Sequence, residues 1–204
     1  LGDDMGLGKT MQVSAFLAGL FHSRLIKRVL VVAPKTLLTH WTKELSVVSL
    51  KDKIRDYSGP NANARNYELK YAFKEGGILL TTYDIVRNNF KMIKGNFTND
   101  FDDEEETLWN YVILDEGHII KNPKTQRAQS LFEIPCAHRI VISGTPIQNN
   151  LKELRERIKP YFLRRMKNEV FLDSGTGEDK KLAKKNELII WLKLTSCQVQ
   201  IIFH

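Results

Sequence analysis

Cysteine is scarce in this sequence, and the two residues present, Cys136 and Cys197, stand far apart. Neither belongs to a Cys-x-x-Cys pair or to a cluster with histidine, so a zinc site and a disulfide framework are both disfavoured. Such sparse, isolated cysteines are typical of a protein from a reducing compartment.

Long apolar runs are also missing. No stretch approaches the roughly 18 residues that a membrane-spanning helix needs, no internal repeat is visible, and the chain does not open with the charged and apolar segments of a secretory signal. These absences lead us to expect no membrane partner.

Acidic residues are outnumbered by basic ones, which gives the 204 residues a net charge of +7. The excess is uneven, because residues 1–150 carry 19 Lys and Arg against 17 Asp and Glu, whereas residues 151–204 carry 12 against 7. A basic surplus favours an anionic partner such as nucleic acid, although a solvated surface would show the same charge.

Four short β-rich runs are apolar almost throughout, at residues 29–33, 78–82, 111–114 and 139–143. Segments with helical character separate or precede them, at residues 11–25, 37–45, 67–73 and 125–132. Apolar strands that alternate with helices predict an α/β fold, with a mostly parallel sheet and helices on both faces. Ligands of such sheets bind at the carboxyl ends of the strands. Residues 99–106 are acidic and predict an exposed loop.

The opening stretch, LGDDMGLGKT, contains the elements of a phosphate-binding loop. The glycines allow the backbone N–H groups of Gly6, Leu7 and Gly8 to converge on phosphates, Lys9 can reach the β and γ phosphates, and the Thr10 hydroxyl can bind Mg²⁺. The helix that begins here adds the positive end of its dipole. The strict pattern would place glycine at position 3, where this chain has Asp3, so a chance glycine-rich turn stays an alternative.

Two further motifs follow predicted strands directly. In YVILDEGH (111–118), Asp115 is a candidate Mg²⁺ ligand, and Glu116 is a candidate for orienting and deprotonating an attacking water. In SGTPIQNN (143–150), small hydroxyl residues and a glutamine at the same edge can sense the γ-phosphate. The candidate residues of that last motif are Ser143, Gly144, Thr145 and Gln148.

The order of DDMGLGKT, APKTLLTHW, LLTTYD, LDEGH, SGTPIQNN and PYFLRRMK resembles the Snf-type DNA-dependent ATPases of helicase superfamily 2. Within that family the chain is most similar to the excision-repair, Cockayne-syndrome-B-like branch, close to the polo-kinase-interacting checkpoint helicase group. The resemblance implies a RecA-like P-loop NTPase lobe, ATP and Mg²⁺ as cofactors, double-stranded DNA or chromatin as partner, and a nuclear location.

The resemblance also implies roles for individual residues. Lys9 and Thr10 match the family's ATP and Mg²⁺ motif, Asp115 and Glu116 its second motif, and His118 a polar relay to the coupling motif that starts at Ser143. Residues that match the family's contacts to the DNA phosphate backbone are Pro34, Lys35, Thr36, Thr81 and Thr82. Small hydroxyls, backbone N–H groups and a lysine at strand ends suit such contacts. Trp41 could stack on a base, but its place on an apolar helical face favours the core.

The chain departs from the family in four places. Gly117 stands where the DEAH form of the motif has alanine. Only Leu1 and Gly2 precede the phosphate loop, so the first strand is expected to be incomplete. NNLKEL directly abuts RERIKPYFLRR, where the family has a longer helical segment, and the second RecA-like lobe with its arginine fingers is expected to be absent. We do not expect Arg164 and Arg165 to replace those fingers.

These patterns predict three regions: a first RecA-like, ATP-binding lobe over residues 1–150, a basic helical segment and linker over 151–185, and the start of a truncated second lobe over 186–204. The leading hypothesis is an internal fragment or truncated product of an ATPase that couples hydrolysis to movement on double-stranded DNA. A non-catalytic fragment that binds nucleotide or DNA is the alternative. A different P-loop enzyme, such as a nucleotide kinase, is disfavoured by the motif series.

Overall fold

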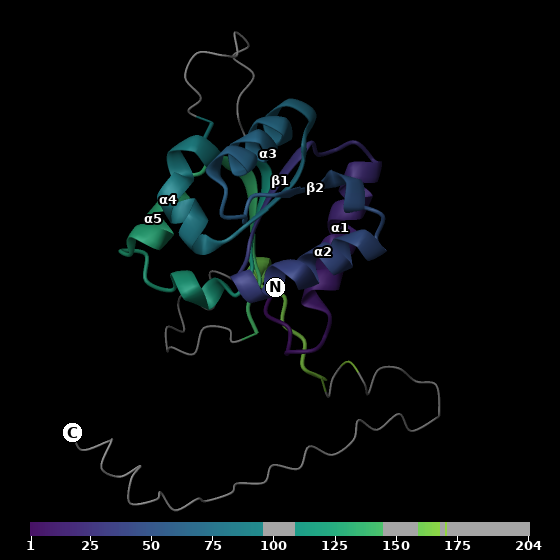
Figure 1. Ribbon diagram of the computed structural model, residues 1–204. Coiled ribbons are helices and arrows are strands. Elements are labelled where there is room, and N and C mark those ends of the chain that lie inside the picture. Colours follow the sequence, from purple (N-terminus) through teal and green to yellow (C-terminus); the bar gives the residue numbers. More distant parts are fainter. Residues whose placement is uncertain (96–108, 145–158, 168–169, 171–204) are drawn as a thin grey trace, which may run out of the picture. The chain divides into compact units, whose positions relative to one another are not determined.

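Five parallel strands form the centre of the fold, in the order β2-β3-β1-β4-β5 (Figure 1). The computed structural model describes residues 1–95, 109–144, 159–167 and 170, all within one unit, Leu1–Val170. The strands span Arg28–Val32 (β1), Ile54–Asp56 (β2), Gly77–Thr81 (β3), Trp109–Leu114 (β4) and Cys136–Val141 (β5). The four predicted strands are confirmed with shifted ends, and β2 is an additional one.

Helices cover both faces of this sheet, as the alternation of strands and helices predicts. The α-helices are α1 (Lys9–His22), α2 (Leu38–Val47), α3 (Ala62–Glu75), α4 (Tyr83–Ile93) and α5 (Gln126–Phe132), with short 3-10 turns η1 (Lys35–Leu37), η2 (Lys51–Lys53), η3 (Gly117–Ile120) and η4 (Lys159–Tyr161). Figure 1 shows α1 and α2 on one side of the sheet and α4 and α5 on the other. No helix among the described residues is long and apolar enough to cross a membrane.

The core is split by the sheet into two apolar layers. On one face, Val13 and Leu17 of α1 and Leu45 of α2 pack against Val29 and Val31. The other face is covered by α3, α4 and α5, which pack against Leu30, Val32 and Leu79, among others. Successive side chains of a strand point to opposite faces. Because β1 and β3 are buried along their whole length, they are apolar throughout rather than alternating.

Two elements escaped prediction from the sequence. The strand β2 has three residues, two of them charged, and lies at the sheet edge, so neither length nor hydrophobicity marks it. The helix α4 is capped by the Thr82 hydroxyl, which accepts a hydrogen bond from the Ile85 N–H, and its backbone is non-helical at Asn89. The buried residues of α4, Tyr83, Val86 and Ile93, have the spacing of one helix face, so a helical pattern was present in the sequence and was overlooked.

The first residues of the chain extend the sheet beyond β5. The Leu1 amino group donates to the Val141 carbonyl (2.7 Å), and the Ser143 N–H donates to the Leu1 carbonyl (3.1 Å). On the opposite side, the N–H groups of Gly2 and Asp4 donate to the carbonyls of Leu163 and Arg165. A short extended segment therefore stands where the incomplete first strand was expected, and residues 163–165 pair with it.

The unit Leu1–Val170 reaches past the domain end expected at residue 150, because residues 163–167 pair with the first residues of the chain. Most of the expected linker and the whole of 186–204 lie outside the described residues, as does the acidic run 99–106.

We predict that Gly76→Ala destabilises the fold strongly. Gly76 ends α3 with φ 82° and ψ −170°, a conformation that only glycine adopts readily, and an added Cβ would lie 2.4 Å from the Lys27 carbonyl oxygen. The backbone strain alone costs about 1–3 kcal/mol. Chemical denaturation of the purified chain measures the change in the free energy of unfolding.

The control is Gly19→Ala. Gly19 lies within α1, and nothing stands within 4 Å of an added Cβ. Alanine there should raise the free energy of unfolding by about 1 kcal/mol, because glycine is a poor helix former. Equal effects of the two substitutions would contradict the prediction.

Candidate functional site

The loop between Asp4 and α1 has the backbone geometry of a phosphate-binding loop. Gly6 and Gly8 both adopt the left-handed conformation, with φ 85° and φ 69°, which L side chains rarely adopt. Successive residues in such conformations make a concave backbone surface whose N–H groups attract anions. Gly8 is also the N-cap of α1, so the loop leads into the positive end of the helix dipole.

Lys9 is folded back onto the loop that carries it. Its ammonium donates to the carbonyl oxygens of Asp3 (2.8 Å) and Asp4 (3.1 Å). The same ammonium would lie 3.8 Å from a Cβ placed on Gly144, the residue after Ser143. The fold therefore brings the first and third motifs together, although more than a hundred residues separate them in the sequence.

Asp3 explains the departure from the strict loop pattern. Its carboxylate is fully buried and accepts hydrogen bonds from the backbone N–H of Arg165 (2.9 Å), from Arg165 Nε (3.1 Å) and from a second guanidinium nitrogen of that residue. Gln12 Nε2 is a further donor at 3.4 Å. Burial by itself raises the pKa of the Asp3 carboxyl, but the hydrogen bonds from Arg165 and Gln12 outweigh it, and the pKa lies below its usual value. Asp3 is thus an ionised structural group under the loop.

Asp115 is held on three sides at the end of β4. Trp41 Nε1 donates to its Oδ2 (2.8 Å), the Glu116 N–H donates to its Oδ1 (2.9 Å), and the Tyr83 hydroxyl donates to its backbone carbonyl (2.6 Å). Its own N–H donates to the Val32 carbonyl of β1. The carboxylate is 5% exposed and has one defined orientation. Burial, together with the nearby charges of Asp115 and Glu116, raises the pKa of Tyr83, so this hydroxyl stays a donor.

The sequence placed Trp41 in the core, and the structure confirms this, since the side chain is fully buried. Its contact with Asp115 was missed. The sequence offered only a general indication of such a contact, because a buried indole N–H usually finds an acceptor. Nothing in the linear sequence identifies that acceptor, which lies 74 residues away.

Glu116 follows in the left-handed conformation (φ 53°), which is uncommon for a residue with a side chain. Its Oε2 lies 3.1 Å from His118 Nδ1, and both side chains are partly exposed. The next residue, Gly117, donates its N–H to the Ile142 carbonyl at the end of β5 (2.9 Å). The second motif is therefore joined through the backbone to the strand that carries Ser143.

Thr145 and Gln148 lie outside the described residues. The expected relay from His118 to the third motif stays a prediction, and the contact that the structure gives for His118 is the one with Glu116.

The expected DNA-contact residues follow β1 and β3, which are neighbours in the sheet. Lys35 and Thr36 are exposed, and Pro34 and Thr82 are half-buried. Thr81 differs from the expectation, because it is fully buried and its hydroxyl donates to the Tyr57 carbonyl (2.9 Å). Its side chain stabilises the sheet edge and is not available to a phosphate.

We predict that Gly117→Ala weakens the fold through Val141. A Cβ on Gly117 would lie 2.1 Å from Val141 Cγ1, so the valine or the loop must move. Because Val141 is 42% exposed and its side chain can move, the cost should be about 1 kcal/mol, the low end for overpacking. Val141→Ala removes the clashing atom, so the double variant should lose less free energy of unfolding than the sum of the single variants. Strict additivity in this mutant cycle would contradict the proposed clash.

Comparison with known proteins places this arrangement in a family. The model of the SNF2-related domain matches residues 1–156. SNF2 domain-containing protein ENL1 of Oryza sativa subsp. japonica is 80% identical over 250 residues, covering 98% of this chain and 25% of the relative. Protein CHROMATIN REMODELING 24 of Arabidopsis thaliana is 51% identical, and human DNA excision repair protein ERCC-6-like is 31% identical, covering 98% of this chain and 23% and 21% of the relatives.

The chain therefore spans about a quarter of the length of these curated relatives. The alignment with ENL1 runs over 250 residues although this chain has 204, so the relative contains residues without a counterpart here. That difference supports the expectation of a stretch missing from this chain.

Among solved structures, the chain is similar to the Sulfolobus solfataricus SWI2/SNF2 ATPase core in complex with dsDNA. The TM-score is 0.66 at 26% identity, and the match covers 81% of this chain and 39% of that one. This similarity confirms the RecA-like α/β fold, and the ERCC-6-like relatives confirm the excision-repair branch. The finer assignment to the polo-kinase-interacting group stays a prediction. The chain belongs to the SNF2-related domain family.

Proposed function

We propose that this chain is the ATP-binding lobe of a DNA-dependent ATPase that couples ATP hydrolysis to movement on double-stranded DNA. The observation that carries the proposal is that Lys9 lies beside Gly144, which follows β5, while Asp115 and Glu116 follow the neighbouring strand β4, in a member of the SNF2-related domain family. In parallel α/β sheets this edge is where ligands bind.

The residues present fit a nucleotide with Mg²⁺. Gly6 and Gly8, both with positive φ, offer backbone N–H groups, whereas the Leu7 N–H donates to the Asp4 carbonyl (3.3 Å) and would exchange it for a phosphate oxygen. Lys9 would exchange the carbonyls of Asp3 and Asp4 for phosphate oxygens, which carry more negative charge and bind an ammonium more strongly. Thr10 and Asp115 would hold Mg²⁺, a metal that proteins bind through one or two carboxylates together with substrate phosphates. Mg²⁺, when bound, neutralises charge that develops on the phosphates.

Glu116 would act as the general base. It stands one residue after Asp115, with a partly exposed carboxylate that can reach a water molecule. His118, 3.1 Å from Glu116, would orient the base.

Movement on DNA would depend on contacts at the same edge. Pro34, Lys35, Thr36 and Thr82 follow two neighbouring strands and are at least partly exposed, so they suit contacts to a phosphate backbone. The hydrogen bonds from Gly117 to Ile142 and from Ser143 to Leu1 would transmit displacements of the second motif to the third. The names of the relatives, which include a chromatin remodelling protein and DNA excision repair proteins, support chromatin or DNA as the partner and the nucleus as the location.

A second candidate is a non-catalytic fragment that binds nucleotide or DNA without turnover. It is favoured by the hydrogen bonds of Lys9 with the Asp3 and Asp4 carbonyls, which occupy the ammonium that would bind the phosphates.

The test is ATP hydrolysis by the purified chain, with and without duplex DNA, beside Glu116→Gln and Lys9→Ala. We expect hydrolysis that rises with DNA and falls about 10²–10⁴-fold in Glu116→Gln, because general bases contribute that much. Lys9→Ala should lose nucleotide binding, whereas Glu116→Gln should retain it.

Two other results would replace the proposal. ATP binding without turnover in the folded chain would leave the non-catalytic fragment as the function. Phosphoryl transfer to a nucleoside monophosphate would indicate a nucleotide kinase.

We further predict that Trp41→Phe weakens Mg²⁺ binding. Phenylalanine keeps the apolar ring but removes the donor to Asp115 Oδ2. Loss of a hydrogen bond that orients a metal ligand typically costs about 10–100-fold in metal affinity or activity. The measurement is the Mg²⁺ concentration that gives half-maximal binding of a fluorescent ATP analogue.

Trp109→Phe is the matched control. Trp109 is also fully buried, and its indole donates to the Ile93 carbonyl (3.0 Å), far from the carboxyl edge of the sheet. It should lose stability without a change in Mg²⁺ dependence. An unchanged Mg²⁺ dependence in Trp41→Phe would show that Asp115 keeps its orientation without the indole.

A further inference from the structure

We propose that Lys167 is a second cation for the phosphate chain of the nucleotide, opposite Lys9. The inference rests on the proposed function, since it concerns the same site. The inference gives a ligand-binding role to residues 163–167. The sequence motifs did not predict that these residues lie at the phosphate loop.

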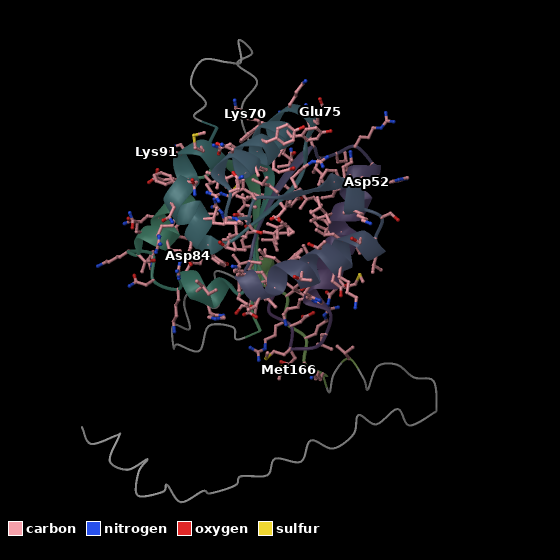
Figure 2. All side chains as sticks on the ribbon, viewed as in Figure 1. Asp52, Lys70, Glu75, Asp84, Lys91 and Met166 are labelled. Atoms are coloured by element: carbon pink, nitrogen blue, oxygen red, sulfur yellow. The ribbon has the colours of Figure 1, made fainter. Side chains whose placement is uncertain are left out.

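The position of Lys167 follows from its contacts with the loop. A Cβ placed on Gly6 would lie 3.4 Å from Lys167 Nζ and 3.6 Å from its Cε, so the side chain lies against the loop itself. Its backbone N–H donates to Asp4 Oδ2 (3.2 Å). Figure 2 shows the neighbouring Met166 at the end of the molecule opposite to Lys70 of α3.

A polar cluster around the buried Asp3 holds this segment in place. Arg165 donates to the buried carboxylate of Asp3 from its backbone and its guanidinium, and the same guanidinium donates to Gln12 Oε1 (2.5 Å). Gln12 Nε2 in turn donates to the Leu7 carbonyl (2.8 Å). We name these three side chains the Arg165 clasp (Asp3, Gln12, Arg165). They connect both ends of the phosphate loop to the segment that carries Lys167.

Among the residues that the structure describes, no carboxylate pairs with the Lys167 ammonium. The nearby Asp4 carboxylate accepts the Lys167 backbone N–H and is approached by Arg164 (3.8 Å), and Arg165 binds Asp3. Lys9 is occupied by two neutral carbonyls. Two ammonium groups therefore lie on one loop, and a polyphosphate is the ligand whose charge matches both. Lysine binds phosphate as a point charge.

The test measures binding of ATP and of adenosine to the purified chain by calorimetry, with Lys167→Ala, Lys167→Arg and the distant control Lys70→Ala. Lys167→Ala should weaken ATP binding about tenfold, the size expected for a lost hydrogen bond to a charged group. Lys167→Arg should restore most of the loss, because it retains the charge. Lys70→Ala should match the parent chain, and adenosine binding should not change in any variant.

The salt dependence gives a readout that a structural role would not move. The loss of affinity in Lys167→Ala should shrink as ionic strength rises, because an exposed charge is screened within about 10 Å at 0.1 M salt. The clasp is tested with Arg165→Lys, which keeps the charge but loses the planar fork. It should weaken ATP binding with Lys167 intact.

The outcomes separate the two proposals. If the parent chain binds ATP and Lys9→Ala does not, while Lys167→Ala binds as tightly as the parent, the inference is wrong and the proposed nucleotide site stands. If the folded parent chain does not bind ATP, both are wrong. If Lys167→Ala loses ATP and adenosine binding equally, its effect is structural and the inference falls.

Discussion

A buried carboxylate in a protein interior must be paired, because an isolated charge there is very costly. Asp3 meets this requirement with Arg165 and Gln12, and much of the site depends on that pairing. It ties the third residue of the chain to a residue 162 positions later. The backbone N–H groups of Gly2 and Asp4 join the same two segments, because they donate to the carbonyls of Leu163 and Arg165. These hydrogen bonds run in the parallel sense and hold residues 163–165 beside residues 2–4.

The second motif also contains a buried carboxylate, but the groups that bind it differ in charge. Asp115 is also nearly buried, but the donors to its carboxylate are the Trp41 indole and the Glu116 N–H, both neutral, while the Tyr83 hydroxyl binds its backbone carbonyl. Neutral donors orient a carboxylate without cancelling its charge, which leaves it able to bind a cation. Asp3 has an arginine and is structural, whereas Asp115 has none and is suited to Mg²⁺. Two aspartates at the same edge thus differ in role because of the charge of their partners.

The fold was largely predictable, and the site only in part. Strands β1, β3 and β4 contain short apolar runs that are buried, and such runs are visible in the sequence, whereas β5 is only partly buried and its apolar residues lie at its end. The turn before α1 was predictable because its glycines act locally, through their own φ angles. Strand β2 was missed because a short charged edge strand has a weak pattern, whereas helix α4 was overlooked although its buried residues have helical spacing. Thr81 was misassigned because its position at the end of a strand does not reveal that its hydroxyl turns inward to Tyr57.

The sequence by itself determined the elements and the motifs, since both depend on residues a few positions apart. It determined which side chains leave the carboxyl ends of the strands, because parallel strands share one edge. Only the tertiary structure decided which of those side chains touch. The contacts of Trp41 with Asp115, of Arg165 with Asp3, of Gly117 with Val141 and of Lys167 with the phosphate loop join distant parts of the chain. They exist because the strand order β2-β3-β1-β4-β5 and the pairing of residues 163–165 with the chain's first residues bring these positions together.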